Sequence, residues 1–300
     1  MKSVSVTIYI TLLSIFVSAP MTKAQDVIMI EPLFEYPVAP DELATLQEKS
    51  DYLVKHFWDQ LDVKSNQPVN QIALNDAFRV YITPLGWASE KEAIQSIDKL
   101  INSLSGNPTL LLQFAKAAEE NLFGPRADFS WDPIYLKFLD AVVKNKKIDK
   151  QRKEKYIKRA ELLRNNAVGA TAPSFNFTDV TGKNAKYFPM STPTLLIFGN
   201  PEDPDWRLAR LKMDTNSQLN EIIDKGKLNI IYITLSDKAD WKKDLENYPK
   251  KWTVGKSDNI RDIIDIRTLP GIYVVGSDGK ILMKNRSLGD ALAKIIEITS

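Results

Sequence analysis

The stretch that decides the fold is Thr194–Arg207, which reads TLLIFGNPEDPDWR. Its first half is a continuous apolar run of the kind that forms a buried β-strand. A turn rich in glycine, asparagine and proline follows, and apolar residues then recur at a helical spacing: Leu208, Leu211, Leu219, Ile222 and Ile223. The sequence therefore predicts a strand that turns directly into a helix, whose free N–H groups face solvent or a ligand.

A second stretch, Thr268–Leu282, reads TLPGIYVVGSDGKIL. It combines a proline turn, an apolar strand, an Asp-Gly hairpin turn and a further strand. Together the two stretches resemble a thioredoxin-like domain of the TlpA/ResA type, over roughly residues 167–300. The resemblance implies an α/β thioredoxin-like fold with a mixed central sheet. It also makes Leu269, Pro270 and Gly271 the cis-proline loop, although relatives usually carry threonine after that proline.

The redox motif of such domains is degenerate in this chain. Relatives carry Phe-x-x-Pro-x-Cys-x-x-Cys at the strand–helix turn. Here Asp203 and Trp206 stand where the two cysteines are expected, with Pro204 and Asp205 between them. The chain contains no cysteine at all. Thiol–disulfide exchange requires a thiolate that attacks a sulfur, so we expect a redox-inactive domain.

Residues 1–24 have the pattern of a signal peptide. Lys2 gives a basic start, residues 4–17 are mostly apolar, and Thr22-Lys23-Ala24 precedes Gln25 as a small-x-small cleavage site. The apolar stretch is short for a membrane span. We therefore expect export, with a mature protein that is soluble in the periplasm or cell envelope and has no transmembrane segment.

The segment between residues 41 and 166 shows helical spacing throughout and no strand-like alternation. Several helix starts are indicated: Ser89 with Glu92 as a capping box, then Asn107, Asp132 and Asp149 as cap residues. Proline follows both Asn107 and Asp132, as is typical of the first helical position. The sequence thus predicts an all-α domain over residues 25–168, and an α+β protein overall.

This helical half also resembles a known family. His56–Asp59, Asn121–Pro125 and Ile134–Leu136 are similar to phrases of an uncharacterised helical domain that precedes thioredoxin-like domains in exported bacterial proteins. That family has no assigned activity, so the resemblance implies architecture and localisation only. Gly169–Pro173 fits a helix end followed by a proline stop, which places the thioredoxin-like domain at residues 169–300.

Three features of the strand–helix turn bear on function: a cap residue, a group of acidic residues and a tryptophan. Asp203 before Pro204 has the pattern of a helix cap. Glu202, Asp203 and Asp205 form an acidic trio, but they lack the spacing and glycine of a known calcium loop, so we expect no metal. Trp206 is either an aromatic plug in the space of the missing disulfide or an apolar contact for a peptide.

Charge and histidine content exclude several classes of function. Without residues 1–24 the chain has 38 basic and 38 acidic residues, which gives no reason to expect nucleic acid or an anionic membrane surface. The basic run over residues 144–164 is expected to be a solvated helix face. His56 is the only histidine, so a zinc centre is not expected. No cofactor is indicated.

Three hypotheses for function follow. The first is a non-catalytic binding or scaffold protein of the cell envelope, which holds a polypeptide or envelope protein at the Trp206/Pro270 face. The second is a thiol-independent enzyme or a metal-binding protein that uses the Glu202–Asp205 turn. The third is a structural module whose helical half binds partners.

Overall fold

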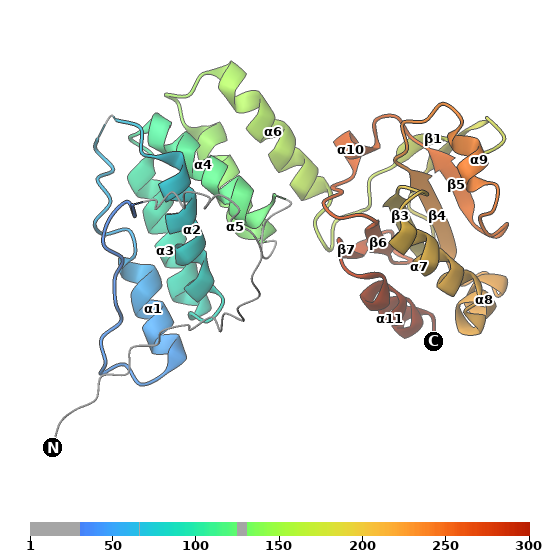
Figure 1. Ribbon diagram of the computed structural model, residues 1–300, viewed down its shortest axis with the longest axis horizontal. Coiled ribbons are helices and arrows are strands. Elements are labelled where there is room, and N and C mark those ends of the chain that lie inside the picture. The colour runs from blue at the N-terminus through green and yellow to red at the C-terminus, as the bar shows by residue number, and fades with distance from the viewer. Residues whose placement is uncertain (1–30, 66, 125–130) are drawn as a thin grey trace, which may run out of the picture. The chain divides into compact units, whose positions relative to one another are not determined.

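Among the residues of the first half that the structure describes, six helices form (Figure 1). The computed structural model describes residues 31–65, 67–124 and 131–300. The predicted signal peptide lies outside these residues. The helices are α1 (Leu46–His56), α2 (Gln71–Leu85), α3 (Glu90–Leu104), α4 (Pro108–Leu122), α5 (Asp132–Lys144) and α6 (Lys150–Asn165).

Side-chain caps fix where most of these helices begin. Ser89, Asn107 and Asp149 each accept a hydrogen bond from a backbone N–H of the first turn, so these predicted starts are confirmed. The Ser89 capping box is not formed, because the Ser89 N–H donates to Asp51 Oδ1 at 2.6 Å instead. A complete capping box joins Thr45 to Glu48 at the start of α1.

The prediction that Asp132 caps α5 is wrong. The helix begins at Asp132 itself, its cap position is Trp131, and no side-chain cap bond forms there. The Asp132 carboxylate is 2.6 Å from the Arg267 guanidinium and 2.8 Å from the Lys284 ammonium. A partner more than a hundred residues away has therefore replaced the local backbone partners that the Asp-Pro pair suggested.

Aromatic side chains fill the centre of the helical region. Phe78, Phe114 and Phe138 are fully buried and meet edge to face, with 5.5 Å between the ring centres of Phe78 and Phe138. Trp58 packs its edge against Phe114 at 4.9 Å. Such contacts stabilise a core beyond the area that they bury, and they hold α2, α4 and α5 against one another.

The second half contains a seven-stranded mixed sheet in the order β2-β1-β5-β4-β3-β6-β7. Strands β3, β4 and β5 run parallel, and the other neighbouring pairs are antiparallel. The predicted mixed sheet and the α+β class are confirmed. The strands are β1 (Phe175–Asp179), β2 (Asn184–Tyr187), β3 (Thr194–Gly199), β4 (Asn229–Thr234), β5 (Thr253–Lys256), β6 (Gly271–Val275) and β7 (Ile281–Lys284).

Two features of this half were not predicted. Strand β5 was missed because it is four residues long and contains Gly255. That glycine is required: a Cβ there would lie 2.5 Å from both the Phe177 ring and the Thr178 carbonyl of β1.

The helix after β3 is also divided, since α7 ends at Asp214 and Asn216 caps a new helix. The helices are α7 (Pro204–Asp214), α8 (Ser217–Asp224), α9 (Trp241–Leu245), α10 (Ile260–Ile263) and α11 (Leu288–Thr299).

Residues 32–300 form one compact unit that includes both halves. The domain boundary at Gly169 therefore stays a prediction. Across the described ranges of the chain, no helix combines the length and the apolar character that a membrane crossing requires.

Candidate functional site

The turn between β3 and α7 is held by side chains that bind its own backbone. Asn200 Oδ1 accepts from the Glu202 N–H at 3.1 Å. Asp203 Oδ1 accepts from the N–H groups of Asp205 and Trp206, at 2.9 and 3.2 Å. Pro204 occupies the first helical position, where no N–H is needed. The predicted cap role of Asp203 is confirmed, and its carboxylate is committed to the helix start.

The three carboxylates of this turn do not converge. Asp203 caps α7, Glu202 forms an ion pair with Lys238, and Asp205 is exposed in the first turn of the helix. In the part of the chain that the structure describes, no group of three or more histidine, cysteine, aspartate or glutamate residues could hold a metal ion. His56 pairs instead with Asp59, at 2.8 Å. The geometry lends no support to an acidic catalytic or metal site at the turn.

Trp206 is buried, with 1% of its surface exposed. Its indole Nε1–H donates to the Tyr248 hydroxyl at 2.8 Å. The indole also lies parallel to the Tyr232 ring, with an interplanar angle of 2° and 5.3 Å between ring centres. The sequence left open whether Trp206 is a plug or a peptide contact, and in this structure its side chain packs in the interior.

Further aromatic rings pack beside this pair in tilted and edge-to-face arrangements. Tyr248 lies 4.7 Å from Tyr232 and 6.2 Å from Trp252, and the Arg210 guanidinium lies 4.7 Å from the centre of the Tyr248 ring. Burial raises the pKa of both Tyr232 and Tyr248, so both phenols stay neutral at physiological pH. The position that the sequence assigned to the second cysteine is thus surrounded by neutral, packed rings.

The loop before β6 lies beside this stack. The Leu269–Pro270 peptide bond is cis. A Cβ built on Gly199 would lie 3.5 Å from both Pro270 Cβ and the Tyr232 hydroxyl, so the proline and the phenol approach the same glycine. Leu269 is 51% exposed, in contrast to the buried Trp206. The face that the sequence predicted around Trp206 and Pro270 therefore offers solvent Leu269 and not the indole.

Gly271, which follows the cis bond, has no room for a side chain. A Cβ there would lie 2.8 Å from Ile266 Cγ2, a separation at which one of the two groups must move. Gly271 pairs with Phe198 in the sheet. The threonine that relatives usually carry at this position would require Ile266 to shift.

A cluster of four charged side chains anchors the segment that leads into the cis bond. Asp265 is 1% exposed and accepts two hydrogen bonds from Arg267, at 3.0 and 2.6 Å, and one from Lys284 at 2.8 Å. Arg267 and Lys284 both also pair with Asp132 of α5. The cluster contains two cations and two anions, so it is neutral as a whole. Sequence reasoning missed it because nothing local links residues 132, 265 and 284.

Backbone and ring contacts complete this anchor. The Asp265 carbonyl accepts from the Tyr273 hydroxyl and from Asn285 Nδ2, both at 2.8 Å. The Arg267 guanidinium lies 4.3 Å from the centre of the Phe123 ring, which adds a cation–π contact. Burial opposes ionisation of Asp265, but the hydrogen bonds from Arg267 and the charge of Lys284 outweigh it, and the pKa of Asp265 lies below its usual range.

Comparison with known proteins identifies the helical half. Residues 7–166 match a family described as a domain of unknown function, DUF5106. This match spans more than half of the chain. The chain belongs to the DUF5106 family. No curated protein matches this DUF5106 protein. The family description names no activity, in agreement with the expectation from the sequence.

Solved structures identify the fold of the second half. A thioredoxin-like protein from Bacteroides caccae ATCC 43185 aligns with a TM-score of 0.69 and 20% identity, over 89% of this chain and 99% of that chain. The DUF5106 protein therefore has a thioredoxin-like fold after its helical region, without the two cysteines.

Shorter structures also align. The C-terminal domain of an uncharacterized protein from Bacteroides fragilis NCTC 9343 has a TM-score of 0.40 and 23% identity, over 44% of this chain and 98% of that chain. The thioredoxin domain of a thiol-disulfide oxidoreductase from Bacteroides vulgatus has a TM-score of 0.38 and 20% identity, over 45% of this chain and 99% of that chain.

Replacing Asp203 tests the cap of α7. Asp203→Ala removes the acceptor for two backbone N–H groups, so the free energy of unfolding should fall by about 1 kcal/mol. Asp203→Asn keeps an acceptor oxygen and should lose less. Urea unfolding followed by circular dichroism measures both values. An Asp203→Ala variant as stable as the wild type would exclude the cap role.

Replacing Asp265 tests the buried cluster. Asp265→Asn leaves Arg267 and Lys284 buried with Asp132 as their remaining carboxylate partner, so the free energy of unfolding at neutral pH should fall by about 3 kcal/mol. Because the folded state lowers the pKa of Asp265, its contribution is present above the unfolded pKa of about 3.9 and is lost as pH falls through the lower folded value. The gap between wild type and variant should therefore narrow on acidification below about pH 4.

Asp262→Asn is the matched control for this experiment. Asp262 is exposed on α10, three residues before Asp265, so its replacement should change stability little at any pH. Urea unfolding of the three proteins at a series of pH values from neutral down to about pH 2 follows the loss of this contribution as the carboxyl is protonated. A gap between Asp265→Asn and wild type that stays constant with pH would contradict the assignment.

Proposed function

We propose that this protein is exported, and that its thioredoxin-like half is a redox-inactive module that binds polypeptide at the cis-proline loop. The observation that carries the proposal is the contrast between two neighbouring side chains. Trp206, which the sequence resemblance places at the second cysteine, is buried, whereas Leu269 beside the cis bond is 51% exposed. The reactive centre is replaced by packing, and an apolar contact remains on the surface.

The loop that carries Leu269 is fixed before any partner binds. Its N-terminal side is anchored by the Asp265 and Arg267 ion pairs, and its C-terminal side enters β6 at Gly271. A preorganised apolar side chain loses little conformational entropy on binding, which favours affinity. Burial of this exposed apolar side chain by a partner adds a hydrophobic contribution to binding. The expected ligand is an extended polypeptide with an apolar side chain at the position that meets Leu269.

Export and the lack of redox activity rest on the sequence. Residues 1–24 have the signal-peptide pattern, and a chain without cysteine has no thiolate for disulfide exchange. The rival proposal of an enzyme or metal site at the acidic turn loses its support, because Asp203 is bound to the α7 backbone and Glu202 to Lys238.

Binding to a permanently unfolded polypeptide tests the proposal. The probe is fluorescein-labelled α-lactalbumin with its cysteines reduced and carboxymethylated, and fluorescence anisotropy gives its Kd. Leu269→Asp places a charge at the proposed contact and should weaken binding about tenfold or more, as expected for loss of a binding anchor. Leu46→Asp is the matched control, because Leu46 is similarly exposed, at 57%, but lies on α1.

Each result of this experiment has a definite meaning. Selective loss of affinity in Leu269→Asp supports the loop as the binding surface. Equal affinity in both variants, or no binding by the wild type, overturns the proposal. An insulin-reduction assay accompanies the binding measurement, and any turnover by the purified protein would contradict the redox-inactive assignment.

Processing in a bacterial host tests export. The full chain should appear in the periplasmic or envelope fraction with Gln25 as its first residue, because cleavage is expected after Ala24. Intact-mass spectrometry of the fractionated protein measures this directly, with the N-terminal glutamine free or cyclised. Retention in the cytoplasm with residues 1–24 intact would contradict the localisation.

A further inference from the structure

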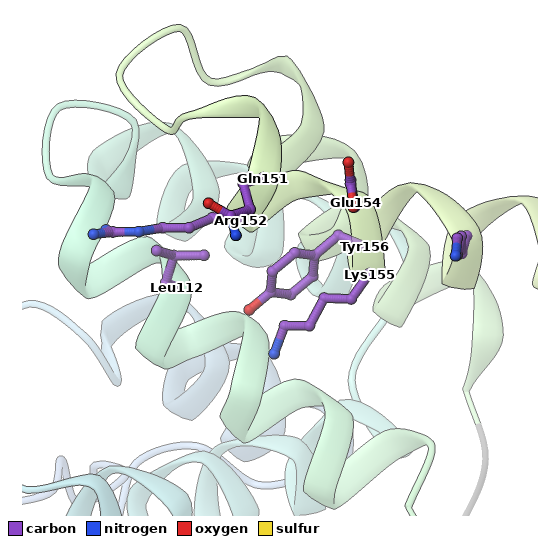
Figure 2. A pocket seen from close by; sticks show the side chains of 7 residues that line it. Leu112, Gln151, Arg152, Glu154, Lys155 and Tyr156 are labelled. Carbon is purple, nitrogen blue, oxygen red and sulfur yellow. The ribbon is translucent and has the colours of Figure 1, made fainter.

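A hollow of about 500 Å³ lies between α4 and α6 (Figure 2). Leu112 of α4 and Tyr156 of α6 supply its apolar part. Arg152, Glu154 and Lys155 of α6 also line this hollow. In Figure 2 the Arg152 side chain runs above Leu112, and the Lys155 side chain runs beside the Tyr156 ring. Volumes of this size are typical of sites for small ligands or headgroups. The hollow thus combines an apolar floor with a cationic rim.

The residues that line the hollow include one carboxylate, Glu154, beside the three cations Arg152, Lys155 and Lys158. Within the described part of the chain, Lys155 and Lys158 form no ion pair with an acidic side chain within 4 Å. Lys155 Nζ lies over the Tyr156 ring, 4.7 Å from its centre. Arg152 pairs with Asp149 at 3.1 Å, and that aspartate is also the cap of α6. Most of the rim's positive charge is therefore available to an external anion.

The spacing of these cations makes them repel one another. Arg152, Lys155 and Lys158 follow at intervals of three residues, so they form one row along α6. Like charges at this spacing destabilise a helix. An anion bound in the hollow would attract all three cations and so offset their mutual repulsion.

Positive charge is concentrated in the segment around α6, although the net charge of the whole chain is small. Residues 144–164 contain ten basic and three acidic side chains, a net charge of +7. The full chain has a net charge of +2, so the remaining residues together carry −5. The sequence alone favoured a solvated helix face here, and the hollow beside the row is what changes that interpretation.

We propose that this hollow binds the phosphate of an anionic phospholipid headgroup and holds the protein at a membrane surface. Basic pockets between helices suit such headgroups, and each further lysine near an anionic bilayer adds to the attraction. Arginine matches the geometry of phosphate oxygens through paired N–H groups. None of the exposed large apolar side chains lies on α6, so the association is electrostatic at the surface and weakens in high salt.

Vesicle flotation with the purified protein tests the proposal. The probes are vesicles of phosphatidylcholine alone and of phosphatidylcholine mixed with phosphatidylglycerol. We expect binding only to the mixed vesicles, with loss in high salt. The double variant Lys155→Glu/Lys158→Glu should reduce the affinity about tenfold or more. A second variant, Lys155→Gln/Lys158→Gln, removes the charges without adding new ones and should lose affinity in the same direction.

The matched control is Lys150→Glu/Lys153→Glu. These residues belong to the same helix and carry the same charge, but they do not line the hollow. Retained binding in this control, with unchanged circular dichroism in all variants, supports the hollow as the site. Equal losses in both glutamate variants would show a general effect of charge and overturn the proposal. So would equal binding to neutral vesicles, or binding of inorganic phosphate, seen by calorimetry, without binding of vesicles.

Discussion

The packing of the Trp206 indole on Tyr232, with its N–H bound to the Tyr248 hydroxyl, is the interaction on which the thioredoxin-like half depends. It joins the first turn of α7 to the centre of the sheet. A buried indole needs a partner for its N–H, and here one tyrosine supplies it while another covers the ring. Neither phenol ionises at physiological pH, because burial raises the pKa of both. The result is a packing contact that does not depend on the ionisation of either phenol.

A second constraint acts on the segment that precedes the cis-proline loop. This constraint is a cluster of ion pairs formed by Asp132, Asp265, Arg267 and Lys284. Asp132 does not cap α5; its carboxylate instead connects the helical region to residues of the sheet half. Buried ion pairs often add little net stability compared with apolar packing, yet removal of one member is costly. The role of this cluster is therefore best understood as positional: it fixes where the loop lies and leaves Leu269 exposed beside it.

Much of the architecture could be predicted from the sequence because it depends on local chemistry. The caps at Ser89, Asn107, Asp149 and Asp203 follow from one side chain and the turn after it. Strand β5 could not be predicted because its four residues, which include Gly255, show no periodic pattern of apolar side chains. The Trp206–Tyr248 bond and the ion cluster join residues that are distant in the chain, and no spacing rule reports such contacts. The solvent exposure of individual side chains could not be predicted either. The sequence did not indicate that Trp206 is buried and that Leu269 is exposed.

Stability measurements at position 206 test the central claim most directly. If Trp206 is a structural replacement for the redox centre, Trp206→Ala should lower the free energy of unfolding by about 3–5 kcal/mol in urea. Trp206→Phe keeps the ring stacking but loses the hydrogen bond to Tyr248, and should cost about 1 kcal/mol, plus a smaller packing term. A Trp206→Ala variant as stable as the wild type would contradict the account, since it would show that the indole is not part of the packed interior.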